Sequence, residues 1–150
     1  MVGKLTLALG LMAVSVTMHT AGVTCALRWL RRRAQPAPSL WPGTRWLIGL
    51  AAWIILLHLG EIITWGLCYA WTGAMPGVQT AVYFSAVTYT TTGYGDHTLP
   101  EAWRLVGAVE ALTGILMCGL STGFFFAVVS RLYQAYDEIA HTSQSSSRPS

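Results

Sequence analysis

Three long apolar segments limit what this chain of 150 residues can fold into. Leu5–Leu27 contains no Asp, Glu, Lys or Arg, and Trp46–Trp71 and Leu105–Leu132 contain one carboxylate each. Each segment exceeds the roughly 20 residues that a helix needs to cross a bilayer. Only 10% of the residues are charged, against about 25% in soluble domains. We therefore predict an all-α membrane protein with three transmembrane helices.

A fourth apolar segment, Val78–Tyr89, is too short to cross a bilayer. A helix over this segment would reach about 18 Å at ~1.5 Å per residue, and the hydrocarbon core is about 30 Å thick. We predict a re-entrant half-helix that begins after Pro76-Gly77. Irregular backbone that follows it at membrane depth has to be buried in protein or line water.

Basic residues indicate the orientation, because cytoplasmic loops are enriched in Lys and Arg. They cluster between the first two segments, which places that loop in the cytoplasm, the N-terminus outside and the C-terminus inside. A cleaved signal peptide is the alternative for the first segment, but cleavage would leave the cluster outside, against the charge rule. The consecutive arginines are interpreted first as a topology anchor and second as a site for anionic lipid. The cluster comprises Arg28, Arg31, Arg32, Arg33 and Arg45.

The half-helix is followed by Thr90-Thr91-Thr92-Gly93-Tyr94-Gly95-Asp96. Glycine adopts left-handed backbone angles without steric cost, and Gly93 and Gly95 stand at alternate positions. A backbone that alternates in handedness turns successive carbonyls to one side, where they replace the water around a cation. An interhelical turn of the same composition is the alternative. The hydroxyl run, Asp96 and the flanking spans favour a carbonyl-lined filter.

On these residues the chain resembles tetrameric potassium channels of the small bacterial pore-only type, with an extra N-terminal transmembrane helix. The resemblance covers about Trp46–Leu132. It implies a homotetramer around a central pore in the bacterial inner membrane, with three transmembrane helices, a re-entrant pore helix and a selectivity filter per subunit. It divides the chain into a first helix and basic loop (1–45), a pore domain (46–132) and a short cytoplasmic tail (133–150). We expect the Ser-rich Ala140–Ser150 to be disordered.

The resemblance also implies roles for single residues. Potassium would bind the carbonyls of the filter and one threonine hydroxyl, and Tyr83 would donate to Asp96, although a solvated carboxylate at the mouth is an equal alternative for Asp96. The last helix would line the inner pore with one face, and lipid or the second span is the alternative for that face. The ion-binding filter comprises Thr91, Thr92, Gly93, Tyr94 and Gly95, with potassium at the first four; filter support comes from Tyr83, Thr88 and Asp96; the inner pore is lined by Ile115, Cys118, Thr122, Phe126 and Ser130; and Gly114 is the hinge.

The chain departs from the common channel pattern at two positions. Thr92 stands where valine is commonest, so its hydroxyl needs a partner. Val87 stands where one well-known bacterial type carries a pore-helix Glu, so the carboxyl pair behind the filter of that type is missing here. We expect selectivity to survive the change at Thr92 and the stability of the filter to be affected by it.

Two carboxylates in the spans, Glu61 and Glu110, are costly in a membrane. We favour structural ties over a proton-linked gate for both, with His58 as the partner of Glu61. His97, beside Asp96, is interpreted as a polar residue of the mouth, with an external pH sensor as the alternative because histidine titrates near neutrality.

The charge pattern gives little support to nucleic-acid binding, because the net charge of +3 comes mostly from the arginine cluster. The three cysteines have neither metal-site spacing nor a disulfide framework. We predict a potassium-selective channel that conducts passively, is not an enzyme and uses no cofactor besides the potassium ions in its filter. A weakly selective cation channel and a non-conducting membrane scaffold are the alternatives. A subunit of an ion-coupled potassium uptake system is disfavoured, since those carry several single-glycine filters on a long chain.

Overall fold

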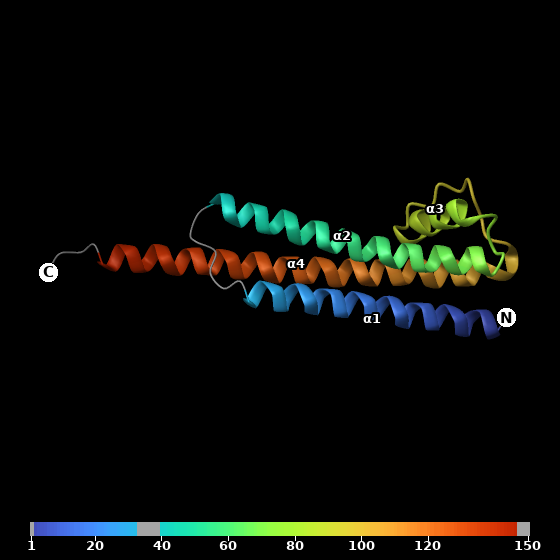
Figure 1. Ribbon diagram of the computed structural model, residues 1–150, viewed down its shortest axis with the longest axis horizontal. Coiled ribbons are helices and arrows are strands. Elements are labelled where there is room, and N and C mark those ends of the chain that lie inside the picture. Colours follow the sequence, from blue (N-terminus) through green and yellow to red (C-terminus); the bar gives the residue numbers. More distant parts are fainter. Residues whose placement is uncertain (1, 33–39, 147–150) are drawn as a thin grey trace.

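The computed structural model describes residues 2–32 and 40–146, with side chains for residues 2–30, 32 and 44–134. Three long helices lie side by side: α1 (Val2–Arg32), α2 (Leu40–Trp71) and α4 (Arg104–Ser146) (Figure 1). The short α3 (Val78–Tyr89) lies beside one end of α2, and a 3-10 turn, η1 (Glu101–Trp103), leads into α4. Each long helix contains a segment apolar and long enough to cross a membrane. The predicted all-α fold with three spans and a short helix is confirmed.

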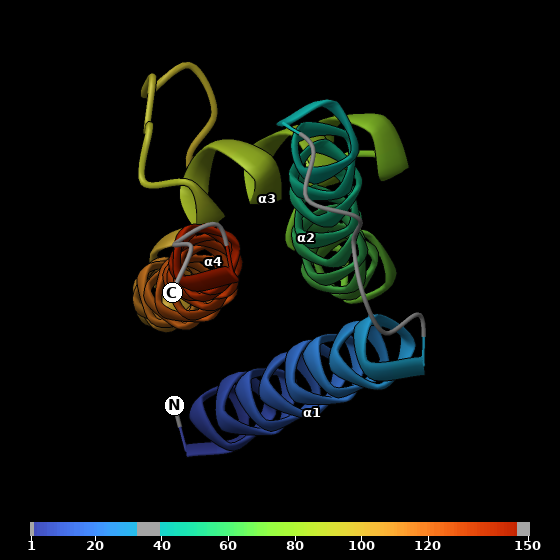
Figure 2. The same cartoon turned by 90° about the vertical axis from the view of Figure 1, so that its left-hand side faces the viewer.

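The end-on view shows how α3 is positioned (Figure 2). It lies on one side of the α2 and α4 pair, and α1 lies on the other side. The N-terminus lies at the end of the molecule that carries α3, and the C-terminus lies at the opposite end (Figure 1). Helix α1 and the loop after α3 therefore lie on opposite sides of the α2 and α4 pair.

Two glycines allow α3 to approach its neighbours closely. A Cβ added to Gly66 on α2 would lie 2.7 Å from the Val82 Cα, closer than real Cβ atoms approach. A Cβ added to Gly114 on α4 would overlap the carbonyl oxygen of Tyr89, the last residue of α3. Small residues at such contacts let backbones touch in membrane helices, where apolar burial gives little driving force.

The turn from α2 to α3 is set by two further glycines. Gly73 has φ +69° just after α2 ends, and Gly77 has φ +75° at the N-cap of α3. The backbone N–H of Ala74 donates to the Tyr69 carbonyl at 2.9 Å, which caps the last turn of α2. The start of α3 after Pro76-Gly77 and its end at Tyr89 agree with the prediction.

A buried carboxylate ties α2, α3 and α4 together. The Tyr69 hydroxyl donates to Glu110 Oε2 at 2.7 Å, and the Ser85 hydroxyl lies 2.5 Å from Glu110 Oε1. Ser85 Oγ also lies 2.8 Å from the carbonyl oxygen of Ile62 on α2. All of this is buried. The contacts of Glu110 are those of a structural tie, with hydroxyls as its partners, and the preference for this role over a proton-linked gate stays a prediction.

The C-terminal tail differs from the prediction over part of its length. Residues 140–146, expected to be disordered, continue α4 as far as Ser146. Polar residues lower helix propensity only slightly, and the first proline after α4 begins is Pro149, so nothing stops the helix earlier. Residues 147–150 and 33–39 lie outside the described part of the chain.

We predict that Gly114→Ala lowers the thermal stability of the detergent-solubilised protein. The added methyl group meets a backbone carbonyl that cannot rotate away, and such overpacking costs about 1–3 kcal/mol. Gly10→Ala is the matched control, since a Cβ there meets nothing within 4 Å and alanine favours a helix by about 1 kcal/mol over glycine. An unchanged or raised Tm for Gly114→Ala would show that α3 does not depend on this contact.

Candidate functional site: the loop after α3

The loop that follows α3 has an alternating backbone. Thr91, Gly93 and Gly95 have φ values of +58°, +52° and +76°, so positive φ occurs at every second residue. Glycine accepts such angles freely, but a β-branched threonine does not. The left-handed angle at Thr91 is a feature that the sequence pattern did not indicate. Such an alternation turns consecutive carbonyls toward one side of the chain.

Hydrogen bonds anchor the start of the loop to α3. The backbone N–H groups of Thr90, Thr91 and Gly93 donate to carbonyls of the last turn of α3 at 2.9–3.1 Å. The Thr90 hydroxyl donates to the Ala86 carbonyl at 2.7 Å and lies 2.9 Å from the Thr92 hydroxyl. Because a hydroxyl has a single proton, Thr92 is the donor in this pair. The hydroxyl of Thr92 thus has the partner that it needs.

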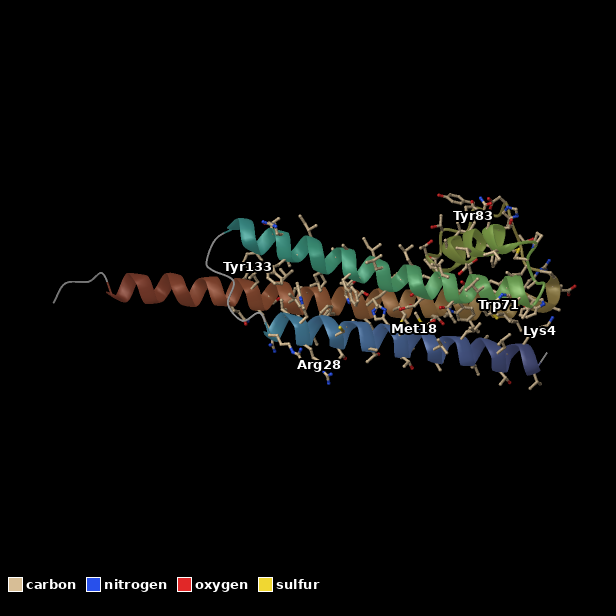
Figure 3. The ribbon with its side chains drawn as sticks, in the orientation of Figure 1. Lys4, Met18, Arg28, Trp71, Tyr83 and Tyr133 are labelled. Atoms are coloured by element: carbon tan, nitrogen blue, oxygen red, sulfur yellow. The ribbon has the colours of Figure 1, made fainter. Side chains whose placement is uncertain are left out.

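The mouth of the loop is held by Asp96. The Tyr83 hydroxyl donates to Asp96 Oδ2 at 2.7 Å, and the His97 backbone N–H donates to Oδ1 at 3.0 Å. The rings of Tyr83 and His97 meet edge to face at 5.9 Å. The hydrogen bond from Tyr83 lowers the pKa of Asp96 below its ordinary value. Figure 3 shows Tyr83 at the α3 end of the molecule, on the side away from α1. The Tyr83–Asp96 bond expected from the resemblance is present.

The third predicted support residue contributes in a different way. Thr88 acts through its backbone, because its carbonyl accepts from the Thr91 N–H at 2.9 Å. Tyr94 is 72% exposed in the single subunit, so most of its ring is left for contacts outside the subunit. A cavity of about 310 Å³ lies behind the loop, between α3 and α4. It is lined by residues that include Val87, Thr88, Gly93, Gly95 and Gly107.

The predicted pore face of α4 is the outward face of the subunit. Its members are exposed, apart from one that is half-buried at the far end. Thr113, Met117 and Ser121 face the interior instead. The Thr122 hydroxyl donates to its own helix, at the Cys118 carbonyl, at 2.8 Å. The face comprises Ile115, Cys118, Thr122, Phe126 and the half-buried Ser130.

Gly114 has a second role besides the predicted hinge. Helix α4 is continuous through this position, and the missing side chain makes room for the Tyr89 carbonyl. A packing role is therefore visible in the structure, and the hinge stays a prediction. Of the expected lipid-binding arginines, Arg32 is exposed, Arg33 lies outside the described residues, and the side chain of Arg31 is not among those described.

The expected partner of Glu61 is wrong. Its Oε1 lies within hydrogen-bond distance of His19 Nδ1 on α1, at 2.8 Å, and its Oε2 accepts from the Tyr89 hydroxyl. His58 bonds instead to the Tyr89 hydroxyl through Nδ1 and to Ser121 Oγ through Nε2, both at 3.1 Å. The side chains of His58 and Glu61, one helical turn apart on α2, do not bond to each other and are linked only through the Tyr89 hydroxyl. Sequence proximity therefore did not identify the direct partner of Glu61.

The sequence contained a signal for this contact that prediction missed. On α1, Ser15 and His19 are four residues apart, and on α2, Glu61 and Trp65 are four apart. Residues at this spacing share a helix face. Trp65 donates to Ser15 Oγ at 3.1 Å, next to the His19–Glu61 pair. The two pairs meet because α1 and α2 run in opposite directions (Figure 1).

Two spans that flank a re-entrant half-helix and an alternating loop define the pore fold of ion channels. Comparison with known families agrees, because residues 50–131 match the family model described as "Ion channel". The chain belongs to this family. It is accordingly an integral membrane channel protein and not an enzyme, and channels of this family typically assemble as oligomers. No curated protein sequence and no solved structure matches the chain.

We predict that Tyr83→Phe raises the pKa of Asp96 toward its ordinary value, because the largest cause of its lowering is the Tyr83 hydroxyl. Carboxyl ¹³C NMR of Asp-labelled protein measures this, and only Asp96 and Asp137 contribute signals. Tyr133→Phe is the control, at a tyrosine far from Tyr83 (Figure 3). An Asp96 titration that is the same in Tyr83→Phe and the unmodified protein would exclude the hydrogen bond as its cause.

Proposed function

We propose that the protein is a potassium-selective channel that conducts passively through a filter formed by residues 91–95. The observation that carries the proposal is the alternation of positive φ at Thr91, Gly93 and Gly95. Potassium would be held by the carbonyls of Thr91, Thr92, Gly93 and Tyr94, with the Thr91 hydroxyl at the inner end. The ions themselves are the only bound groups that this function requires.

We propose a homotetramer as the conducting unit. Every residue from Thr90 to Thr98 is exposed in the single subunit. Irregular backbone is tolerated at membrane depth only when it is buried in protein or lines water, so further copies are needed around it. Each chain carries one filter segment, and a ring of carbonyls around an ion takes four. The exposed ring of Tyr94 and the cavity behind the loop are surfaces that a neighbouring copy would use.

The proposal extends to topology and surroundings. The filter mouth and the N-terminus lie at one end of the molecule, and the C-terminus lies at the other (Figure 1). The arginine cluster at the end of α1 and the start of α2 supports a C-terminal end in the cytoplasm and a filter mouth outside. We propose the division into residues 1–45, 46–132 and 133–150. Helix α1, in the first part, packs against α2 and α4 of the pore domain. Exposed Arg32 supports a contact with anionic lipid headgroups at the cytoplasmic surface.

Reversal potentials of the protein in liposomes, under opposed potassium and sodium gradients, test the function. We expect a value near the potassium equilibrium potential. Gly95→Ala should move it toward zero, because a left-handed backbone costs an L-residue about 1–2 kcal/mol. Gly10→Ala, on the open face of α1, should leave it unchanged.

A reversal potential near zero for the unmodified protein would support the weakly selective cation channel and contradict the potassium-selective one. The absence of conductance in liposomes that contain the tetramer would leave the non-conducting scaffold. Full selectivity in Gly95→Ala would overturn the carbonyl-ring assignment.

We predict that Phe126→Ala raises the resting open probability in single-channel recordings. Phe126 is 71% exposed on the proposed pore face, where four phenyl rings would form a constriction that excludes water. Phe125 is half-buried within the subunit, so Phe125→Ala should alter stability more than gating. Greater sensitivity at Phe125 would mean that the pore face of α4 is assigned one residue out of register.

A further inference from the structure

Five side chains, four of them buried, form a closed ring of hydrogen bonds that joins α1, α2, α3 and α4; we call it the polar ring. It runs from Glu61 Oε1 to His19 Nδ1 (2.8 Å), from His19 Nε2 to Ser121 Oγ (3.0 Å) and from Ser121 Oγ to His58 Nε2 (3.1 Å). It returns from His58 Nδ1 to the Tyr89 hydroxyl (3.1 Å) and from there to Glu61 Oε2. His58 is half-buried, and the other four are at most 6% exposed.

The number of protons in the polar ring decides whether all five of its contacts can be hydrogen bonds. Five contacts need five protons, one in each. With Glu61 ionised and both histidines neutral, Glu61 supplies none and each of the other four side chains supplies one. One contact then joins two lone pairs, and the ring carries a net negative charge. A fifth proton, on the Glu61–His19 pair, fills every contact in one direction around the ring and makes it neutral.

We propose that the polar ring is a binding site for one titratable proton. All five contacts are hydrogen bonds only when this proton is bound. An uncompensated charge and an unfilled contact are costly in a buried site, and the site lies midway along the three spans. Met18, the neighbour of His19, marks this depth between the two ends of α1 (Figure 3). The occupied form is therefore the more stable fold.

The surroundings of the polar ring offer few other charges. Lys4 and Arg28 lie at opposite ends of α1 (Figure 3). From α4, Cys118 interacts electrostatically with Glu61 and Tyr89, and Glu110 interacts with Tyr89. Glu110 has its own partners on α2 and α3.

A metal ion is a poorer occupant than a proton. One nitrogen from each histidine and one Glu61 oxygen lie within 4.8 Å of one another. Among the described residues, however, every buried side-chain nitrogen and oxygen already has a hydrogen-bond partner. An ion would have to displace these contacts, whereas a proton completes them.

The polar ring connects α1 to the proposed filter. Tyr89 is the last residue of α3, and its carbonyl packs against Gly114. The Thr90–Gly95 loop begins one residue later. Loss of the proton removes one hydrogen bond from the ring and so weakens the anchoring of Tyr89. If the proposed function holds, it also weakens the anchoring of the filter that follows. This gives α1 a role that a pore-only subunit lacks.

Thermal unfolding of the purified protein, compared at about pH 7 and about pH 9, tests the proton site. In the unfolded chain Glu and His titrate at about 4.3 and about 6.5, so the unfolded chain has released this proton by about pH 7, whereas the proposed folded site still holds it. The folded state then binds more protons than the unfolded state, and stability falls as the pH rises. Glu61→Gln keeps all five hydrogen bonds without a titratable proton, since its amide donates to His19 Nδ1 and its carbonyl accepts from Tyr89. We expect the Tm of the unmodified protein to fall by about 3 °C more than that of Glu61→Gln.

Two further variants separate this role from a merely structural one. His97→Gln changes a histidine outside the ring and should keep the pH dependence of the unmodified protein. Tyr89→Phe opens the ring to three contacts, which the protons of neutral His19, Ser121 and His58 already fill. We expect a lower Tm at pH 7 and a flatter pH dependence. The cysteines and Glu110 are common to all these proteins, so their contributions cancel.

A pH dependence that is equally steep in Glu61→Gln and Tyr89→Phe as in the unmodified protein would overturn the proposal. So would a pH dependence that a metal chelator abolishes. Potassium flux into liposomes at the same two pH values tests the link to the filter, with flux in Glu61→Gln expected to be independent of pH. Absence of flux at both pH values would contradict the proposed channel function and not the proton site, which the melting data decide separately.

Discussion

Irregular backbone inside a bilayer has no water to bond to, and the loop after α3 is such a backbone. The N–H groups of Thr90, Thr91 and Gly93 bond back to α3, and the alternating φ values turn the loop carbonyls toward one side. The rest of the pore domain keeps this loop in place. Gly66 and Gly114 let α3 lie against α2 and α4 at backbone contact, and Asp96 ties the outer end of the loop to Tyr83. These contacts are needed to hold the alternating φ values, because the left-handed angle at Thr91 is unfavourable for an L-residue.

The elements of the pore domain were predictable because their signals are local. Helix α3 begins and ends where the sequence indicated, since Pro76-Gly77 marks its start and its length is short for an apolar segment. The Tyr83–Asp96 bond was found through the spacing that the resemblance supplied. The long helices extend beyond their apolar segments, and the extension to Ser146 was missed. Hydropathy reports where a helix meets lipid, and it does not report where the helix ends in water.

The contacts between spans were not predictable in the same way. Glu61 was paired with His58 because the two lie on one helix, but its partner is His19, which is 42 residues away along the chain. Membrane helices associate through a few polar and small residues, so one misplaced pair changes the packing of a whole span. The matched spacing of Ser15 with His19 and of Glu61 with Trp65 carried this information. It becomes readable only once α1 and α2 are known to be antiparallel neighbours.

Both buried carboxylates hold α3, and both sites are short of a proton when the carboxylate is ionised. Ser85 Oγ lies within hydrogen-bond distance of the Ile62 carbonyl and of Glu110, but a hydroxyl has one proton to donate. Both contacts are hydrogen bonds only when Glu110 carries a proton and donates to Ser85. The same shortage exists in the ring around Glu61. Helix α3 is thus held at its middle and at its end by groups that bond best when neutral, the state that a bilayer interior favours. The low dielectric that makes these carboxylates costly is what makes them firm supports for the loop.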